Sequence, residues 1–313
     1  MKRAFVFPGQ GSQAPGMGQA LAERFPAARL LFQEVDEALS QNLSRLMFEG
    51  PEDELTLTEN AQPALLAVSL AVVRVLEREA GLDLARHAAY VAGHSLGEYS
   101  ALAAAGALSV ADAARLVKRR GQAMQKAVPL GQGAMAALLG IEIDAAREVA
   151  EAAADGQICA VANDNSPGQI VVSGHRAAVE RAVALAAEQG ARRSIMLPVS
   201  APFHSPLMRP AADMMAEALG KSALEAPAAP LVANVTAAAT SDPSEIKELL
   251  VEQVTRMVRW RESVQLFAEN EVEEVVEIGV GRVLAGLVKR IDRTLAAISV
   301  GAPSEVEALA SRL

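Results

Sequence analysis

A serine between two glycines offers the clearest chemistry in this sequence. Residues 93–97 read Gly-His-Ser-Leu-Gly, between the apolar run Ala88–Ala92 and the alanine-rich stretch Ser100–Ala107. A β-capable run before a G-x-S-x-G pattern and a helix-forming run after it predict a tight strand-to-helix turn with the serine at its tip. We therefore predict that Ser95 is a nucleophile and that the Leu96 amide, at the helix N-terminus, faces a developing oxyanion. The alternative is a surface loop that matches the pattern by chance.

The serine hydroxyl needs a general base, and histidine is the usual one. Of the four histidines, only His204 lies in a stiff loop, between Pro202 and Pro206, and downstream of the serine as Ser-before-His chain order requires. The aspartates at predicted helix ends fit capping or solvated positions better than a third catalytic role. We therefore expect a Ser95–His204 dyad, in which an amide or a main-chain carbonyl orients the imidazole.

A glycine-dense loop follows the first predicted strand, Ala4–Phe7. Residues 8–13 read Pro-Gly-Gln-Gly-Ser-Gln, which fits neither the G-x-G-x-x-G spacing nor the Gly-Lys-Ser/Thr of phosphate-binding loops. An oxyanion hole needs two donors, and the second commonly comes from a loop after another strand of the same sheet. We expect this loop to supply that second amide. A plain tight turn is the alternative.

Composition limits the classes of protein that this chain can belong to. The 313 residues are 51% hydrophobic, and the formal net charge of -9 argues against nucleic acid as the main partner. The only cysteine, Cys159, excludes an intramolecular disulfide and fits a reducing compartment. The apolar run after Met1 is too short for a signal peptide or a membrane span. We expect a cytoplasmic protein with no membrane partner, and no Cys/His spacing indicates a metal site.

The elements that must position these residues divide the chain into a large domain and an insertion. Strands and helices alternate over residues 1–128 and 199–313, which predicts a mostly parallel sheet covered by helices. Residues 129–198 follow the order strand, helix, strand, strand, helix, strand, which is typical of a ferredoxin-like unit. Within the large domain, helical periodicity over Gln19–Leu39 predicts helical structure. In the insertion, a turn is predicted at Asn163–Gly168.

Several motifs occur in order along nearly the whole chain. They are Phe-Pro-Gly-Gln-Gly-Ser-Gln at 7–13, Gly-His-Ser-Leu-Gly-Glu-Tyr at 93–99, Arg120-Gly121 with Met124-Gln125, Asn-Asp-Asn-Ser-Pro-Gly-Gln at 163–169, Ala-Pro-Phe-His-Ser at 201–205, Gln253 before Trp260, and Glu-Ile-Gly-Val-Gly-Arg-Val-Leu at 277–284. Together they resemble the malonyl-CoA:acyl carrier protein transacylases of bacterial type II fatty acid synthesis. The resemblance implies a hydrolase-like three-layer α/β domain with the ferredoxin-like insertion. One departure is Val280, where many relatives have proline between two glycines.

The resemblance also implies roles for individual residues. Ser95 would be the acylated nucleophile and His204 its base. The amides of Gln10 and Leu96 would form the oxyanion hole. Gln253 would help to hold His204 through a hydrogen bond.

Substrate recognition follows from the same resemblance. Arg120 would bind the malonyl carboxylate, because a guanidinium pairs bidentately with a carboxylate and so selects malonyl over acetyl or long acyl chains. Asn163 would reach the cleft wall from the insertion. Leu96 and Phe203 resemble the malonyl-selective pattern rather than the methylmalonyl-selective one.

The predicted activity is a ping-pong transfer of malonyl from malonyl-CoA to the phosphopantetheine thiol of acyl carrier protein, through a malonyl-serine. We expect no metal, no cofactor and a monomeric chain. A serine thioesterase or other hydrolase, a malonyl transferase of polyketide or malonate decarboxylase systems, and a non-catalytic carrier-protein-binding scaffold are the alternatives. Carrier proteins are generally acidic, so docking needs a local basic patch on this net acidic chain. The alternative interpretation of its basic residues is that they are scattered surface charges. The candidates are Arg256, Arg259, Arg261, Lys289 and Arg290.

Overall fold

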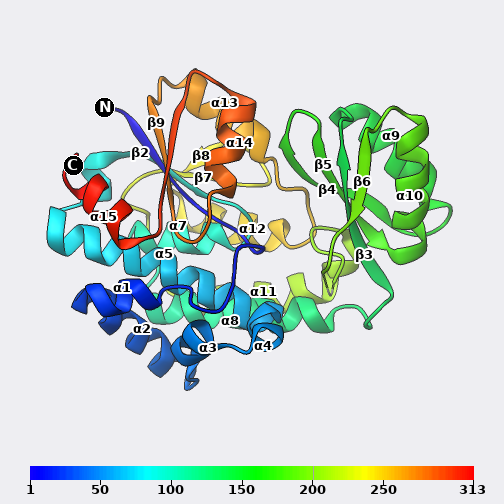
Figure 1. The fold of residues 1–313 in the computed structure, drawn as a ribbon. Coiled ribbons are helices and arrows are strands. Elements are labelled where there is room, and N and C mark those ends of the chain that lie inside the picture. The colour runs from blue at the N-terminus through cyan, green and yellow to red at the C-terminus, as the bar shows by residue number, and fades with distance from the viewer. Residues whose placement is uncertain (200) are drawn as a thin grey trace.

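The fold contains two β-sheets in two bodies of unequal size. The computed structural model describes residues 1–199 and 201–313. Figure 1 shows a larger body that carries both chain termini and a smaller body (green) built from the middle of the chain. The smaller body lies at the end of the larger one that is remote from the termini.

The larger sheet is mostly parallel. Its six strands are β1 (Arg3–Phe7), β2 (Ala88–Gly93), β7 (Leu231–Val232), β8 (Ala239–Thr240), β9 (Glu274–Ile278) and β10 (Ala296–Val300). They lie in the order β10-β9-β1-β2-β7-β8, and only the β7–β8 pair is antiparallel. The predicted α/β class with a mostly parallel sheet is therefore confirmed.

Helices cover both faces of this sheet, because its strands are apolar on both sides. Phe5 and Phe7 of β1 belong to the core under one face, whereas Ala4 and Val6 belong to the core under the other. The first core is covered by α1 (Gln19–Arg24), α2 (Pro26–Leu39), α3 (Leu43–Glu49), α4 (Glu52–Thr56), α5 (Thr58–Ala80), α6 (Leu84–His87), α7 (Gly97–Ala104), α8 (Val110–Lys126), α11 (Arg209–Gly220), α12 (Pro243–Gln253) and α15 (Pro303–Ala310). The second core is covered by α13 (Trp260–Glu269) and α14 (Val283–Ile291).

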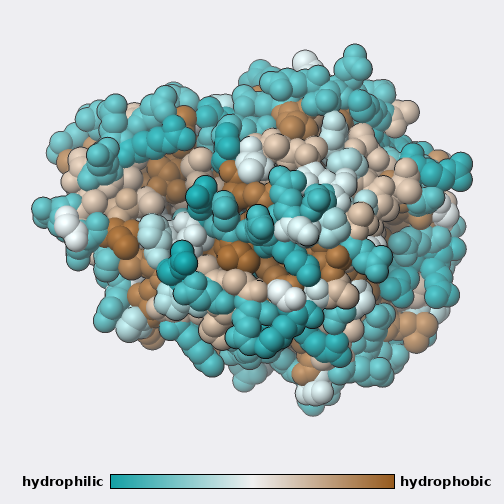
Figure 2. Space-filling view, turned by 180° about the vertical axis from the view of Figure 1, so that it is seen from behind, coloured by the Kyte–Doolittle hydropathy of each residue, from teal (hydrophilic) through white to brown (hydrophobic). Residues whose placement is uncertain are grey.

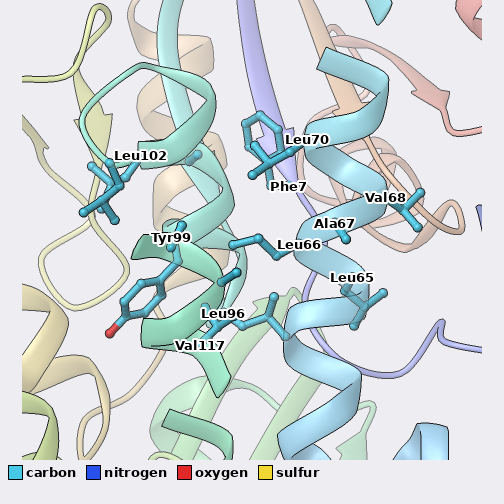
Figure 3. Close-up of a cluster of buried hydrophobic side chains, with 14 of the residues drawn as sticks. Phe7, Leu65, Leu66, Ala67, Val68, Leu70, Leu96, Tyr99, Leu102 and Val117 are labelled. Carbon is cyan, nitrogen blue, oxygen red and sulfur yellow. The ribbon is translucent and has the colours of Figure 1, made fainter. Parts of the chain in front are cut away.

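The long helix α5 lies at the centre of the first core. Figure 3 shows Leu66 of α5 extending toward α7, with Phe7 of β1 near Leu70. By length and composition α5 is apolar enough to cross a membrane, but 89% of its most apolar stretch is buried inside the fold. It therefore has the surroundings of a core helix.

Seen from behind, the surface of the molecule is mostly covered by hydrophilic side chains, with smaller apolar areas between them (Figure 2).

The helical structure predicted over Gln19–Leu39 is confirmed, and it is divided into the two helices α1 and α2. Phe25 separates them in an extended conformation (φ -122°, ψ 116°). The cause is Pro26, because the residue before a proline is driven out of the helical region, while proline itself suits the first position of a new helix.

The smaller body contains the antiparallel sheet β4-β5-β3-β6. Its elements are β3 (Gly133–Leu139), α9 (Ile143–Ala154), β4 (Cys159–Ser166), β5 (Gln169–His175), α10 (Arg176–Glu188) and β6 (Arg193–Met196). This is the ferredoxin-like order that the sequence predicts. The exact domain boundaries, 1–128 with 199–313 and 129–198, stay a prediction.

One face of this smaller sheet packs on its own helices, and the other faces the larger body. Val149 of α9 and Val179 of α10 belong to the core on the first face. On the second face, Met135, Ala162 and Val171 pack with a segment that follows β6, and this segment leads back into the larger body. The sheet thus forms a wall opposite β2 and α7.

The turn predicted at Asn163–Gly168 is shorter than expected. Strand β4 continues to Ser166, with register shifts on both sides of Asp164, and only Pro167 and Gly168 form the turn. The strand continues because Asn163, Asp164 and Ser166 pair with residues of β5. Asn163 and Asp164 pair with Val258 of the larger body, whose carbonyl accepts a 3.0 Å hydrogen bond from the Asp164 amide.

Candidate active site

Ser95 lies at the tip of the turn that joins β2 to α7, as the glycine pattern predicts. Its φ is +54°, a left-handed conformation that costs a non-glycine residue energy. The flanking glycines are required by space, because a Cβ on Gly93 would lie 1.9 Å from the Gly97 carbonyl carbon. A Cβ on Gly97 would lie 2.2 Å from the Phe7 carbonyl oxygen. Only glycine at both positions lets strand and helix approach closely enough to hold this turn.

His204 is the partner of Ser95. The Ser95 Oγ lies 2.8 Å from His204 Nε2, and His204 Nδ1 lies 2.8 Å from the main-chain carbonyl oxygen of Gln253. A carbonyl only accepts hydrogen bonds, so Nδ1 carries the proton and Nε2 offers a lone pair to the serine hydroxyl. The arrangement is that of a base poised to accept the serine proton. Of the two orienting groups that the sequence left open, the one present is the carbonyl.

The electrostatic surroundings keep the His204 imidazole neutral. Burial disfavours the charged ring, and the Arg120 guanidinium adds to the effect, so the pKa of His204 falls to about 3. The Gln253 carbonyl works in the opposite direction, and nearby His94 adds slightly to the lowering. A neutral imidazole is the form that a general base requires.

Arg120 points into the same site from α8. It is 1% exposed, and its Nη2 donates to Ser95 Oγ at 3.0 Å and to Gln253 Oε1 at 2.8 Å. Its Nη1 donates to Gln62 Oε1 at 3.0 Å, and its Nε has no partner among the described residues. Gly121 makes this approach possible, since a Cβ there would lie 2.6 Å from the Thr58 carbonyl oxygen.

The predicted oxyanion donors lie beside the serine. Gln10 and Leu96 line the cleft that contains Ser95 and His204. Among the described residues, neither main-chain amide donates a hydrogen bond, so both N–H groups remain available. The Ser95 amide, by contrast, donates to Asn234 Oδ1 at 2.8 Å. Both predicted donors therefore belong to residues that line the cleft, and their role as an oxyanion hole stays a prediction.

The cleft between the two bodies has a volume of about 600 Å³. Its floor is polar and comes from the larger body, whereas the insertion and the segment that follows β6 supply an apolar wall. Asn163 and Phe203 both line this cleft, as the resemblance implies. The apolar wall consists of Met135, Val171, Leu197, Val199 and Phe203.

His94 ties the serine turn to the insertion. Its Nε2 lies 2.8 Å from Asn165 Oδ1, and its ring centroid lies 5.7 Å from that of Trp260. Burial lowers the pKa of His94. The ring is therefore neutral, and the Nε2–H donates to the Asn165 oxygen, which makes His94 a link between the two walls of the cleft.

Sequence reasoning missed Asn234, Glu98 and Gln62, which surround the site. Asn234 follows β7, and its Nδ2 donates to the Gly93 carbonyl at 2.7 Å. Glu98 is 1% exposed and lies in the otherwise uncharged helix α7, which was the one available signal. Burial raises the pKa of Glu98, whereas the Asn234 amide, the Gln253 side-chain amide and Arg120 act in the opposite direction and favour the carboxylate, the form in which both oxygens accept hydrogen bonds.

Four of the five basic residues predicted to dock a carrier protein have acidic or polar partners of their own. Arg256 lies 3.3 Å from Glu252, and Arg290 donates to Gln169 at 2.9 Å. Arg259 and Arg261 are likewise paired, with Glu262 and Asp164. The docking patch stays a prediction. No group of three or more His, Cys, Asp or Glu side chains that could hold a metal ion occurs within residues 1–199 and 201–313.

The comparisons with known proteins all indicate the same protein family. Residues 4–306 match the model of the acyl transferase domain. The chain is 48% identical over 307 residues to the malonyl CoA-acyl carrier protein transacylase of Bacillus subtilis. The aligned region covers 98% of this chain and 95% of that protein.

Solved structures agree. An acyl-carrier-protein S-malonyltransferase from Bartonella henselae superposes with a TM-score of 0.97 at 54% identity, over 100% of this chain and 99% of that one. A malonyl-transacylase solved in complex with a type II PKS acyl-carrier protein superposes with a TM-score of 0.96 at 42% identity, over 100% of both chains.

Proposed function

This chain belongs to the acyl transferase family, and we propose that it transfers a malonyl group from malonyl-CoA to the phosphopantetheine thiol of an acyl carrier protein. The observation that supports malonyl as the transferred acyl group is the buried guanidinium of Arg120, which lies 3.0 Å from the nucleophilic oxygen of Ser95. An acyl chain bound to Ser95 meets a cation at that position. A carboxylate at its far end satisfies the cation, whereas a methyl group leaves a buried charge unpaired.

In the first half-reaction, Ser95 Oγ attacks the thioester carbonyl carbon while His204 Nε2 takes the hydroxyl proton. The new oxyanion accepts hydrogen bonds from the amides of Gln10 and Leu96. When the tetrahedral intermediate collapses, the carbon–sulfur bond breaks and His204 returns the proton to the sulfur of CoA. The product is malonyl-Ser95, and the imidazole is neutral again.

In the second half-reaction, the phosphopantetheine thiol takes the place of CoA. His204 Nε2 accepts the thiol proton, and the sulfur attacks the ester carbonyl of malonyl-Ser95. The carbon–oxygen bond then breaks, and His204 returns the proton to Ser95 Oγ. Both halves use the same imidazole and the same pair of amides, which explains how one small site serves two thiols in turn.

Arg120 holds the malonyl carboxylate through both steps. Arg120 Nη2 donates to Ser95 Oγ and to Gln253 Oε1. When the substrate binds, its carboxylate replaces Ser95 Oγ as the acceptor of the first of these hydrogen bonds. Bidentate pairing orients the acyl group with its carbonyl toward Ser95. Asn163 and Phe203 line the opposite side of the cleft and limit the width available to the acyl group.

The main alternative reaction is hydrolysis of the acyl-serine. A general esterase has no use for a buried cation at the end of its acyl pocket, so Arg120 favours transfer of a dicarboxylic acyl group. The carrier protein as acceptor is supported by relatives named for that transfer. We further propose that the product supplies fatty acid elongation in the cytoplasm, that the chain acts as a monomer, and that no cofactor takes part.

Intact-protein mass spectrometry tests the proposal. The protein is mixed with malonyl-CoA, and acyl carrier protein is added after the first spectrum. We expect a malonyl adduct that survives in water and moves to the carrier, and no adduct on Ser95→Ala. An adduct that disappears in water without the carrier would instead establish a hydrolase. A folded protein that forms no adduct would leave only a scaffold role.

A further inference from the structure

Glu98 is a buried acid that the proposed mechanism does not use. It lies in the first turn of α7, three residues after the nucleophile, and is 1% exposed. Its Oε1 accepts a 2.6 Å hydrogen bond from the main-chain amide of Asn234, and its Oε2 accepts one from the side-chain amide of Gln253. An acid buried this deeply persists only where its oxygens have donors, and here both do.

The first branch from Glu98 leads to the serine turn. The Asn234 side chain accepts from the Ser95 amide at 2.8 Å and donates to the Gly93 carbonyl at 2.7 Å. It thus holds the end of β2 that leads into the strained residue Ser95. Glu98 fixes the backbone of Asn234, so the carboxylate supports this turn from behind.

The second branch leads to Arg120 through Gln253. The Gln253 side chain donates from Nε2 to Glu98 and, at 2.9 Å, to the Ser95 carbonyl, while its Oε1 accepts from Arg120 Nη2 at 2.8 Å. The amide group therefore has one permitted orientation. If it rotated by half a turn, its NH₂ would face the guanidinium and its oxygen would face the carboxylate.

We propose that Glu98 is a positioning residue for malonyl selectivity: it fixes the orientation of the Gln253 amide, whose oxygen in turn holds the Arg120 guanidinium toward the acyl group on Ser95. This inference rests on the proposed function, since it concerns the same site and the same acyl group. The His204 anchor is separate, because it is the main-chain carbonyl of Gln253 rather than its side chain. Selectivity and general base catalysis consequently depend on different atoms of one residue.

The isosteric change Glu98→Gln separates these two functions. The Asn234 amide is part of the main chain and cannot rotate, so the new side chain keeps its oxygen there and turns its NH₂ toward Gln253. Two NH₂ groups then face each other, and the Gln253 amide rotates to relieve the conflict. Its NH₂ comes to face Arg120, and the guanidinium loses its acceptor and turns away.

The experiment compares loading of Ser95 by malonyl-CoA and by acetyl-CoA, each followed by intact-protein mass spectrometry. For Glu98→Gln we expect kcat/KM for malonyl loading to fall about tenfold or more, as for the loss of a hydrogen bond to a charged group, with acetyl loading changed less than about threefold. The ratio of the two rates therefore collapses. A merely structural role would lower both rates by the same factor and leave the ratio unchanged, which would overturn the proposal.

Glu277→Gln is the matched control. Glu277 is also a fully buried glutamate, and its oxygens accept from the main-chain amides of Leu284 and Ala285 at the start of α14, on the other face of the sheet. We expect this change to lower the thermal midpoint without changing the malonyl-to-acetyl ratio. A changed ratio here would show that any loss of a buried carboxylate affects selectivity, and the proposal would fail.

A second variant covers the case in which Glu98→Gln does not fold. Gln253→Met removes the amide and keeps the main-chain carbonyl that anchors His204. We expect the same loss of malonyl preference relative to acetyl, and an unchanged ratio of the two loading rates would contradict the inference. The wild-type protein distinguishes this failure from that of the proposed function, because absence of a malonyl adduct on the wild type would remove the proposed function itself.

Discussion

The two walls of the cleft differ in what they contribute. The wall from the larger body is made of polar groups, among them Ser95 and the buried His204 and Arg120, each held by named hydrogen-bond partners. The wall from the insertion is apolar over Met135 and Val171, with the two amide side chains of residues 163 and 165 as its polar groups. The first wall can transfer protons and bind charged groups, whereas the second can only limit the width of the cleft and exclude water from it. Substitutions on the two walls should therefore differ in kind as well as in size.

The polar wall is assembled from segments far apart in the chain. The nucleophile follows β2, Arg120 comes from α8, and the base and its anchor, His204 and Gln253, come after the insertion. The carboxyl ends of parallel strands bring such segments together at one edge of a sheet. The insertion interrupts the chain between Arg120 and His204, which places its sheet directly opposite the polar groups.

The largest effect is expected on the polar wall, from His204→Ala. Removal of the general base should lower the rate of malonyl loading by about 10²- to 10⁴-fold, the range typical of general acid–base catalysis. Rapid-quench mass spectrometry of the malonyl adduct measures the rate, and the thermal midpoint checks that the protein is folded. A loading rate within about threefold of the wild type would show that another group accepts the serine proton.

Arg120→Met should have the next largest effect, and a selective one. Loss of a bidentate ion pair should lower kcat/KM for malonyl loading by about 10²-fold and leave acetyl loading nearly unchanged. The neighbouring Arg119→Met is the matched control, because Arg119 is 41% exposed and lies 3.7 Å from Glu217 on the surface. Equal losses of malonyl loading in both variants would mean that the overall charge of α8, rather than the buried guanidinium, matters.

The pH dependence of loading tests the electrostatics of the same wall. The base acts in its unprotonated form, and the pKa of His204 is lowered to about 3 by burial and by Arg120. Loading should therefore change less than about twofold between pH 7.5 and 5.5, whereas an imidazole of ordinary pKa would lose about tenfold. The loading rate should decrease only at still lower pH, where His204 becomes protonated. A decrease centred near pH 6.5 would show that the free enzyme holds His204 in a more solvated environment.

The polar wall also shows what sequence can and cannot predict. The Ser95 turn and the His204 loop were predictable because glycine spacing and bracketing prolines fix local backbone shape. Gln253 was assigned only through resemblance, and the group that anchors His204 is its main-chain carbonyl, which every residue type possesses. A backbone role of this kind leaves no signature in side-chain chemistry.

Long-range partners account for the other differences. The burial of Glu98 depends on Asn234 and Gln253, which lie more than a hundred residues away in the chain. The contact of Asn163 with Val258 in the larger body likewise joins residues far apart in the chain. The break before Pro26, by contrast, was readable from the sequence, since proline restricts the residue before it.

The smallest effect is expected on the apolar wall, from Val171→Ala. Val171 is 5% exposed and lines the cleft opposite Ser95, so its truncation widens the acyl space without touching a polar group. Malonyl loading should stay within about threefold of the wild type, because the carboxylate still binds Arg120. Loading from methylmalonyl-CoA should rise about tenfold relative to malonyl, since room for one methyl group is worth that much in an apolar pocket. A loss of malonyl loading as large as that of Arg120→Met would break the distinction between the walls, because it would give an apolar side chain a part in the chemistry.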